Sequence, residues 1–201
     1  RAGTGRPARD GGRVTRIVDR GAIVAGWVGV GMAATVAVSF LLVIPLGEAA
    51  VALLALPGGL LIGYYANARS ERRGGPWPRL LANALLAGLM TGFAFALLFL
   101  GTKALFFTAD DGYRDPAAGG RISCRQGADC VYRRYLADGR GPALEAAGVT
   151  DAVSFADFYW AEQRGTAGAL LGLTLLGALG GGFAYGVTNR RPVDGPAPSK
   201  A

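Results

Sequence analysis

Histidine is absent from this chain of 201 residues, and no other feature of the composition excludes as much chemistry. Without it there is no Ser-His or Cys-His catalytic pair, no zinc-protease helix and no histidine ligand for haem. Only two cysteines occur, too few for a four-ligand zinc site. The phosphate-binding pattern GxxxxGK[ST] is missing as well. We therefore expect a protein that is not an enzyme and that holds no metal and no cofactor.

Charge is scarce too: charged residues make up 17% of the chain, where soluble proteins average about a quarter. The apolar residues are collected into long runs, and a helix needs about 20 of them to cross a bilayer. The runs at 21–46, 49–66, 80–107 and 166–188 meet or approach that length. They lack the alternation of a β-barrel. The sequence thus predicts an all-α integral membrane protein, a four-transmembrane-helix bundle.

Arginine and lysine concentrate in three segments, which are the tail 1–20, the loop 67–79 and the tail 189–201. With four spans all three segments lie on the same side, and the positive-inside rule makes that side cytoplasmic. We expect these residues to meet anionic inner-leaflet lipid rather than nucleic acid, because they flank spans. The Arg- and Ala-rich composition indicates a bacterial origin, hence the cytoplasmic (inner) membrane. A cleavable signal peptide is not expected, because the first apolar run is too long.

The segment 108–165 falls on the opposite, extracytoplasmic side and contains both cysteines. Cys124 and Cys130 are predicted to form a local disulfide, since that compartment permits one. Short helices are expected at 132–136 and 142–147. A segment of this length is predicted to be a small, partly helical loop domain clamped by the disulfide.

A further helix is predicted to start at Ser154, with Ser154 as its cap and Asp157 facing back toward the first turn. It carries four aromatic residues just before the last span. They suit a membrane-interface belt, or alternatively a docking patch for another subunit. These residues are Phe155, Phe158, Tyr159 and Trp160.

Acidic residues cluster before the cysteines, at Asp110, Asp111 and Asp115 around Gly112. Oxygen ligands of this kind suit calcium, but their spacing fits no known calcium-binding loop. We favour the interpretation that they are solvated turn residues.

Small residues recur at helical spacing in the third and fourth runs, where close helix approach favours association in lipid. They are expected to pack within the bundle or to form a groove for a partner. The residues are Ala84, Gly88, Gly92, Ala96, Gly168, Gly172, Gly182 and Gly186. Gly26, Gly29 and Ala33 form a shorter stripe of the same kind.

The second run is interrupted by Pro57, Gly58 and Gly59, which predict a kinked helix, since proline removes a helix hydrogen bond. A structural kink is favoured. The alternative is a gate, because broken helices can form transport sites at the membrane midplane.

These patterns predict a non-catalytic accessory or scaffolding subunit of a larger membrane assembly, whose partners are other integral membrane subunits or a second copy. The alternative is a small transporter or channel gated at Pro57, Gly58 and Gly59. A third hypothesis is a lipid-acting enzyme that uses the outer carboxylates.

Overall fold

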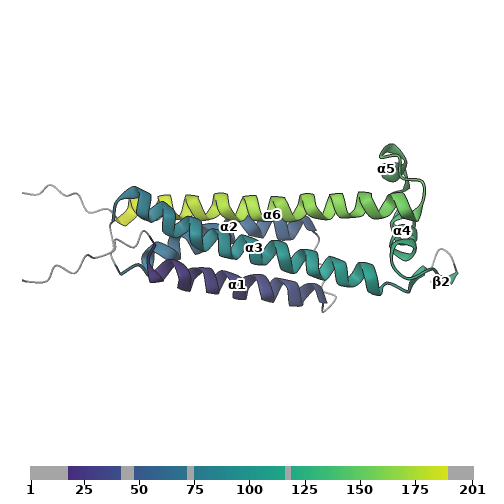
Figure 1. Cartoon of the computed structure of the whole chain (residues 1–201), viewed down its shortest axis with the longest axis horizontal. Helices are drawn as coiled ribbons and strands as arrows, with labels where there is room; N and C mark the ends of the chain where they lie inside the picture. Colours follow the sequence, from purple (N-terminus) through teal and green to yellow (C-terminus); the bar gives the residue numbers. More distant parts are fainter. Residues whose placement is uncertain (1–17, 42–47, 72–74, 116–118, 190–201) are drawn as a thin grey trace, which may run out of the picture.

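The computed structural model describes residues 18–41, 48–71, 75–115 and 119–189. Most of both predicted tails, the end of the first predicted span at 42–46 and part of the basic loop at 72–74 lie outside them. The described chain folds into helices and one hairpin (Figure 1). These elements are α1 (Arg20–Leu41), α2 (Glu48–Ala68), α3 (Trp77–Ala109), β1 (Gly112–Asp115), β2 (Gly120–Ser123), α4 (Ala128–Ala137), α5 (Gly141–Ala146) and α6 (Ala152–Asn189).

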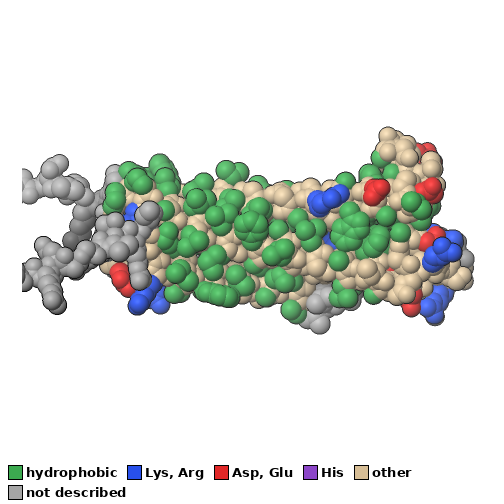
Figure 2. Space-filling view, viewed as in Figure 1, with side chains coloured by type: hydrophobic (Ala, Val, Ile, Leu, Met, Phe, Trp, Pro, Cys, Tyr) green, Lys and Arg blue, Asp and Glu red, His purple; other side chains and the backbone are tan. Residues whose placement is uncertain are grey.

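Three helices, α1, α3 and α6, are long and apolar enough to cross a membrane. The fourth long element, α2, has a shorter described apolar stretch, Leu53–Ala68. Figure 2 shows hydrophobic side chains covering the face of the bundle between its charged ends. The prediction of a predominantly helical chain is confirmed, and the length and apolar composition of these three helices suggest a membrane protein.

The four long helices alternate in direction: α1 and α3 run toward the cap, and α2 and α6 run back (Figure 1). By "the cap" we mean residues 110–162, which form the hairpin, α4, α5 and the first turns of α6. We call the opposite end of the bundle, where α1 begins and α6 ends, the basic end. There Asn189 contacts the hydroxyl of Tyr64, and the Asp19 carboxylate contacts Ser70. The described chain therefore begins and ends at one end of the bundle.

Helices α2 and α6 meet backbone to backbone, because glycines on both sides remove the side chains that would separate them. A Cβ added to Gly63 would lie 1.9 Å from the carbonyl oxygen of Ala178, and one added to Gly181 would lie 2.0 Å from that of Leu60. Gly59 and Gly177 make equally close approaches. This seam was not among the sequence predictions, which placed the contact residues of the second half on α3 and elsewhere on α6.

The predicted small-residue stripe divides into two groups. In the first group, the added Cβ would meet the facing helix: Gly88 meets Ala178 and Gly182 meets Ala84, both at 2.6 Å. Gly92 and Gly186 pack similarly, and Ala96 packs beside a buried cluster. Gly168 and Gly172 differ, because no described atom lies within 4 Å of an added Cβ. The prediction that these two glycines pack within the bundle is therefore wrong, because both face outward.

Helix α6 starts well before the predicted last span and merges it with the predicted aromatic helix into one rod of 38 residues. The residue that caps the N-terminus of this helix is Asp151. Its carboxylate accepts hydrogen bonds from the backbone N–H groups of Val153 at 3.0 Å and Ser154 at 2.8 Å. The prediction of Ser154 as the cap is wrong, because the helix begins two residues earlier and Asp151 has the shorter reach to its free donors.

Helix α2 continues through Pro57 without interruption. Gly58 meets only the end of the Met32 side chain, at 3.6 Å, whereas Gly59 packs against the backbone of Thr174. Gly59 thus serves close packing, and the predicted kink at Pro57, which a continuous helix allows, stays a prediction.

Candidate functional site

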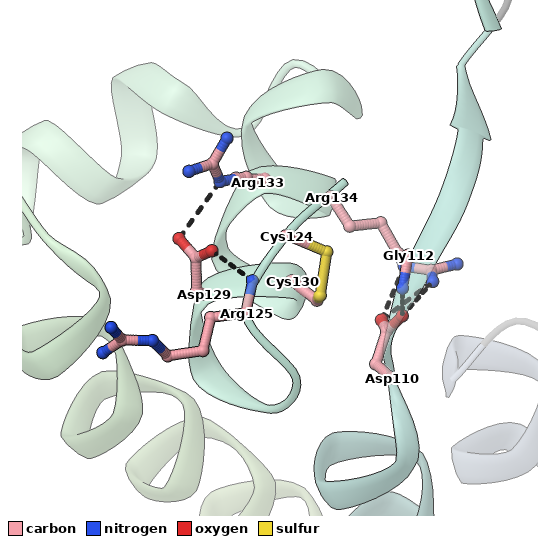
Figure 3. Close-up of a disulfide and its surroundings, with 8 residues drawn as sticks. All are labelled: Asp110, Gly112, Cys124, Arg125, Asp129, Cys130, Arg133 and Arg134. Carbon is pink, nitrogen blue, oxygen red and sulfur yellow. Dashed lines mark hydrogen bonds and ion pairs between the residues drawn. A yellow bond between two sulfur atoms is a disulfide. The ribbon is translucent and has the colours of Figure 1, made fainter. Parts of the chain in front are cut away.

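Two ion pairs tie the cap to the end of α3 and to α6, and a disulfide links two segments within the cap. Cys124 and Cys130 are joined, with their Cα atoms 5.1 Å apart, so the end of β2 is linked to α4 as predicted (Figure 3). Asp129 lies in the same loop. Its carboxylate accepts the backbone N–H of Arg125 at 2.8 Å and the Nε–H of Arg133 at 3.1 Å. These hydrogen bonds lower the pKa of Asp129, and the bond from the backbone of Arg125 has the largest effect.

An aromatic cluster forms the core of the cap. Phe155 is fully buried, with ring centroids 4.9 Å from Tyr135 and 5.4 Å from Tyr132. Tyr159 is also buried and lies 4.8 Å from Phe107 at the end of α3. The belt and docking-patch predictions are thus wrong for Phe155 and Tyr159, because both rings are used inside the cap.

The other two predicted aromatic residues lie at the edge of that core. Phe158 and Trp160 are half-buried and pack against the same cluster. Their remaining exposed area is compatible with either prediction, and neither prediction is tested.

Two arginines tie α4 and α5 to the long helices. Arg134 donates to both carboxylate oxygens of Asp110, with Nη2 2.8 Å from each (Figure 3). Arg140 donates to Glu162 at 2.6 Å and lies 4.2 Å over the ring of Tyr135, whose hydroxyl donates to Glu162 at 3.1 Å. Burial, and next the charge of Glu162, raise the pKa of Tyr135 above its ordinary value. The cap is therefore fixed to the end of α3 and to α6.

The described part of the acidic cluster forms no calcium site, and the side chain of Asp115 lies outside the described residues. The carboxylate of Asp110 is occupied by Arg134 and by the backbone N–H of Gly112 at 3.3 Å. Among the described residues, there is no group of three or more acidic, histidine or cysteine side chains that could hold a metal ion.

A polar network at the basic end was missed by the sequence analysis. Asp19 forms an ion pair with Arg79, and its second oxygen accepts the hydroxyl of Ser70. Asn83 accepts the backbone N–H of Asp19 at 3.0 Å and donates to Asn67 at 3.3 Å. Burial opposes ionisation of Asp19, but the hydrogen bonds from Ser70 and Arg79 outweigh it and lower its pKa.

Two buried hydroxyl groups between the two ends of the bundle are satisfied within their own helices. Thr91 and Thr174 are buried, and each hydroxyl donates to the carbonyl oxygen four residues earlier. A cavity of about 10 Å³ lies between α1, α3 and α6, and every residue that lines it has an apolar side chain. A space of this size holds at most one water molecule.

The outward glycines lie on one face of α6, in the half near the cap. Gly165, Gly168 and Gly172 all have open space beside them, and Ala161 and Ala169 are exposed next to them. At 100° per residue, Ala161, Gly165, Gly168 and Gly172 fall within about 60° of each other on the helix. We call this surface the open α6 face; it is a shallow strip where a second helix can approach the backbone.

The chain matches no family model, and comparison with curated proteins and with solved structures finds no match either.

Proposed function

We propose that this chain is a non-catalytic, four-span subunit of a bacterial cytoplasmic membrane assembly, and that the open α6 face receives a helix of a partner subunit. The observation that carries the proposal is the contrast along one helix. Neighbouring helices fill the space beside Gly177, Gly181 and Gly182. A Cβ added to Gly168 or Gly172, in contrast, would have no described atom within 4 Å. A small-residue strip that the described part of the chain leaves uncovered is what an incoming membrane helix requires.

The fourth span is α2, whose 21 residues reach about 32 Å, enough for the hydrocarbon core. It packs along α6 for much of its length. With four spans, the basic loop after α2 and both tails face the cytoplasm, and the cap faces outward. The common position of the first and last described residues at the basic end supports this topology.

Rigidity of the cap supports a scaffold rather than a transporter. A buried aromatic core and two arginine ion pairs hold it against α3 and α6, and a disulfide closes the loop between β2 and α4. Helix α2 is continuous at Pro57, and the cavity between α1, α3 and α6 is no larger than one water. These observations favour the scaffold over a channel gated at Pro57, Gly58 and Gly59.

The test is partner recovery after affinity purification in mild detergent, following chemical cross-linking in intact cells. Gly168→Leu and Gly172→Leu should each remove the partner, because the new side chain blocks backbone contact. Gly31→Leu is the matched control: Gly31 on α1 also has open space beside it and should retain the partner. Equal recovery in all three variants, or solute flux by the isolated chain in vesicles, would contradict the proposal.

Topology is tested separately by cysteine labelling with a membrane-impermeant reagent, after Cys124 and Cys130 are replaced by serine. Glu71 and Gln126 are both exposed and lie at opposite ends of the molecule. Gln126→Cys should label in intact cells, and Glu71→Cys only after the cells are opened. The reverse pattern would overturn the assigned orientation.

A further inference from the structure

An open cleft of about 960 Å³ lies in the cap, between the disulfide loop and the first turns of α6. By the disulfide loop we mean residues 123–130. The wall formed by this loop includes Arg125 and Asp129, and the wall formed by α6 includes Val153 and Asp157. One wall of the cleft therefore belongs to the same helix that carries the open α6 face.

The α6 wall of the cleft continues into the open α6 face. Four exposed residues of α6 recur at intervals of four along the chain; they are Val153, Asp157, Ala161 and Gly165. Residues at this interval form one ridge on the surface of a helix. The first two line the cleft, and the last two belong to the open α6 face. A helix that packs on the open α6 face and follows this ridge is therefore directed into the cleft.

The cleft lies outside the hydrocarbon core, a placement that rests on the proposed function and its membrane topology. Helix α6 ends at Asn189 at the basic end, and Gly168 lies 21 residues earlier, about 32 Å along the helix. The hydrocarbon core is about 30 Å thick, so Gly168 lies at its outer boundary. Val153 lies about 22 Å beyond Gly168. Whatever occupies the cleft is therefore in water, where it can carry charged side chains.

Two side chains of opposite charge in the cleft have no ion-pair partner within the described part of the chain. Arg125 engages Asp129 through its backbone N–H, and Figure 3 shows its side chain pointing away from the disulfide. Asp157 is exposed, and its carboxylate pairs with no described residue. Asp129 and Arg133, which also line the cleft, are instead paired with each other at 3.1 Å. The cleft thus offers one cation and one anion to an occupant.

We propose that the cleft receives the extracytoplasmic continuation of the partner helix that packs on the open α6 face. This segment carries a carboxylate toward Arg125, a cationic side chain toward Asp157, and a small or apolar side chain over Val153, which is 80% exposed. Charges in such a position select the partner and fix its register more than they add affinity.

A second copy of this chain is a poorer occupant. Two copies in one membrane have the same orientation, so their α6 helices would lie parallel. Equal residues then meet at equal height, and Asp157 of one copy lies at the height of Asp157 of the other. Like charges at the same height are unfavourable, whereas a different subunit can supply the opposite charge.

The first experiment is site-specific photo-cross-linking in intact cells, with a benzophenone amino acid placed at one position at a time. Val153 reports on the cleft, and Ala169, which is exposed beside the open α6 face, reports on the membrane part. Both positions should cross-link to the same protein, and the peptide linked at Val153 should lie just outside the span linked at Ala169. Leu136, 42% exposed on α4 and outside the cleft, is the control and should not give this adduct.

Charge reversal tests the recognition itself. Arg125→Glu and Asp157→Lys should each lower the yield of the Val153 adduct about fivefold, as expected for the loss of an exposed ion pair. Arg121→Glu is the matched control, because Arg121 is an exposed arginine of β2 outside the cleft. Reversing the acidic residue of the linked partner peptide to lysine should restore the adduct of Arg125→Glu. Unchanged yield in both reversals would overturn the proposed charge recognition.

The cross-links distinguish this inference from the proposed function. Adducts at Ala169 with none at Val153, or with a different protein at Val153, overturn the inference and leave the interface on the open α6 face standing. An adduct at Val153 between two copies of this chain overturns it as well. Absence of adducts at both positions contradicts the proposed function and this inference together. If a charge variant fails to fold, the two cross-links made with the natural charges still decide.

Discussion

Asp19 and Arg79 form an ion pair although 60 positions separate them in the chain. The pair joins the residue just before α1 to the first turn of α3. Ser70, two residues after the end of α2, donates its hydroxyl to the same carboxylate. One side chain therefore gathers the ends of three helices at the basic end of the bundle.

The first prediction is that Asp19→Asn destabilises the protein by about 3 kcal/mol, because removing one partner of a buried pair leaves the other charge uncompensated. Both side chains are largely buried, with 9% of Asp19 and 14% of Arg79 exposed. Thermal unfolding in detergent measures the loss. Asp138→Asn, at an exposed cap position, is the control and should leave the midpoint unchanged.

The same contact predicts a dependence of stability on acid. The pKa of Asp19 is lower in the folded protein than its ordinary value of 3.8. The stabilisation is therefore fully present above pH 4 or so and is lost as the pH falls through the lowered pKa. A titration of the unfolding midpoint from pH 6 downward should show a steeper decline for the wild-type protein than for Asp19→Asn. Parallel curves would contradict this assignment.

A packing prediction compares two glycines that the sequence does not distinguish. Gly63→Ala should destabilise the isolated protein by about 1–3 kcal/mol, since its new methyl group would overlap the Ala178 carbonyl oxygen. Gly172→Ala has open space and should be neutral or slightly stabilising, because alanine favours helix by up to about 1 kcal/mol. Unfolding of both variants without any partner gives the comparison. Equal destabilisation by the two substitutions would contradict the close contact between the backbones of α2 and α6.

The cap should depend on its central ring. Phe155→Ala removes a fully buried side chain that contacts Tyr132 and Tyr135, at an expected cost of about 3–5 kcal/mol. Near-ultraviolet circular dichroism should lose its aromatic signal while the helical signal changes little. Val153→Ala is the nearby control, because that side chain is 80% exposed.

Reduction of the disulfide should loosen the cap and leave the long helices intact. Cys124 and Cys130 are six positions apart, and closing so short a loop contributes about 2 kcal/mol in the chain-entropy account. The double variant with serine should be cut faster by trypsin at Arg125, which is exposed. Unchanged cleavage at Arg125 would show that the ion pair between Asp110 and Arg134 is sufficient to hold the loop.

Hydropathy predicted the long helices well, because crossing a bilayer imposes a length and composition that any single run reveals. It located α3 from Leu80, three residues after the helix begins at Trp77. The disulfide and the two short cap helices were also predicted. What the pattern could not reveal is which face of α6 points inward, because glycine occurs on both faces.

The missed features depend on partners distant in sequence. Asn67 and Asn83 look like ordinary polar residues at span ends, yet both are fully buried and hydrogen-bonded to each other. The hairpin left only a weak local signal, the glycines around its turn at 119 and 120. Phe155 and Tyr159 were interpreted from their depth alone, whereas the position of α4 over them decides that they are buried.

The continuity of α6 determines how the cap is presented. A domain joined by a loop can swivel, but here Phe155 and Tyr159 belong to the same helix as Gly182 at the other end. The length of α6 therefore sets both the distance of the cap from the bundle and the rotation of the cap about the helix axis. Inserting one residue near Gly165 would turn the first turns of α6 by about 100° and shift them by about 1.5 Å, so Tyr159 would lose its contact with Phe107 on α3.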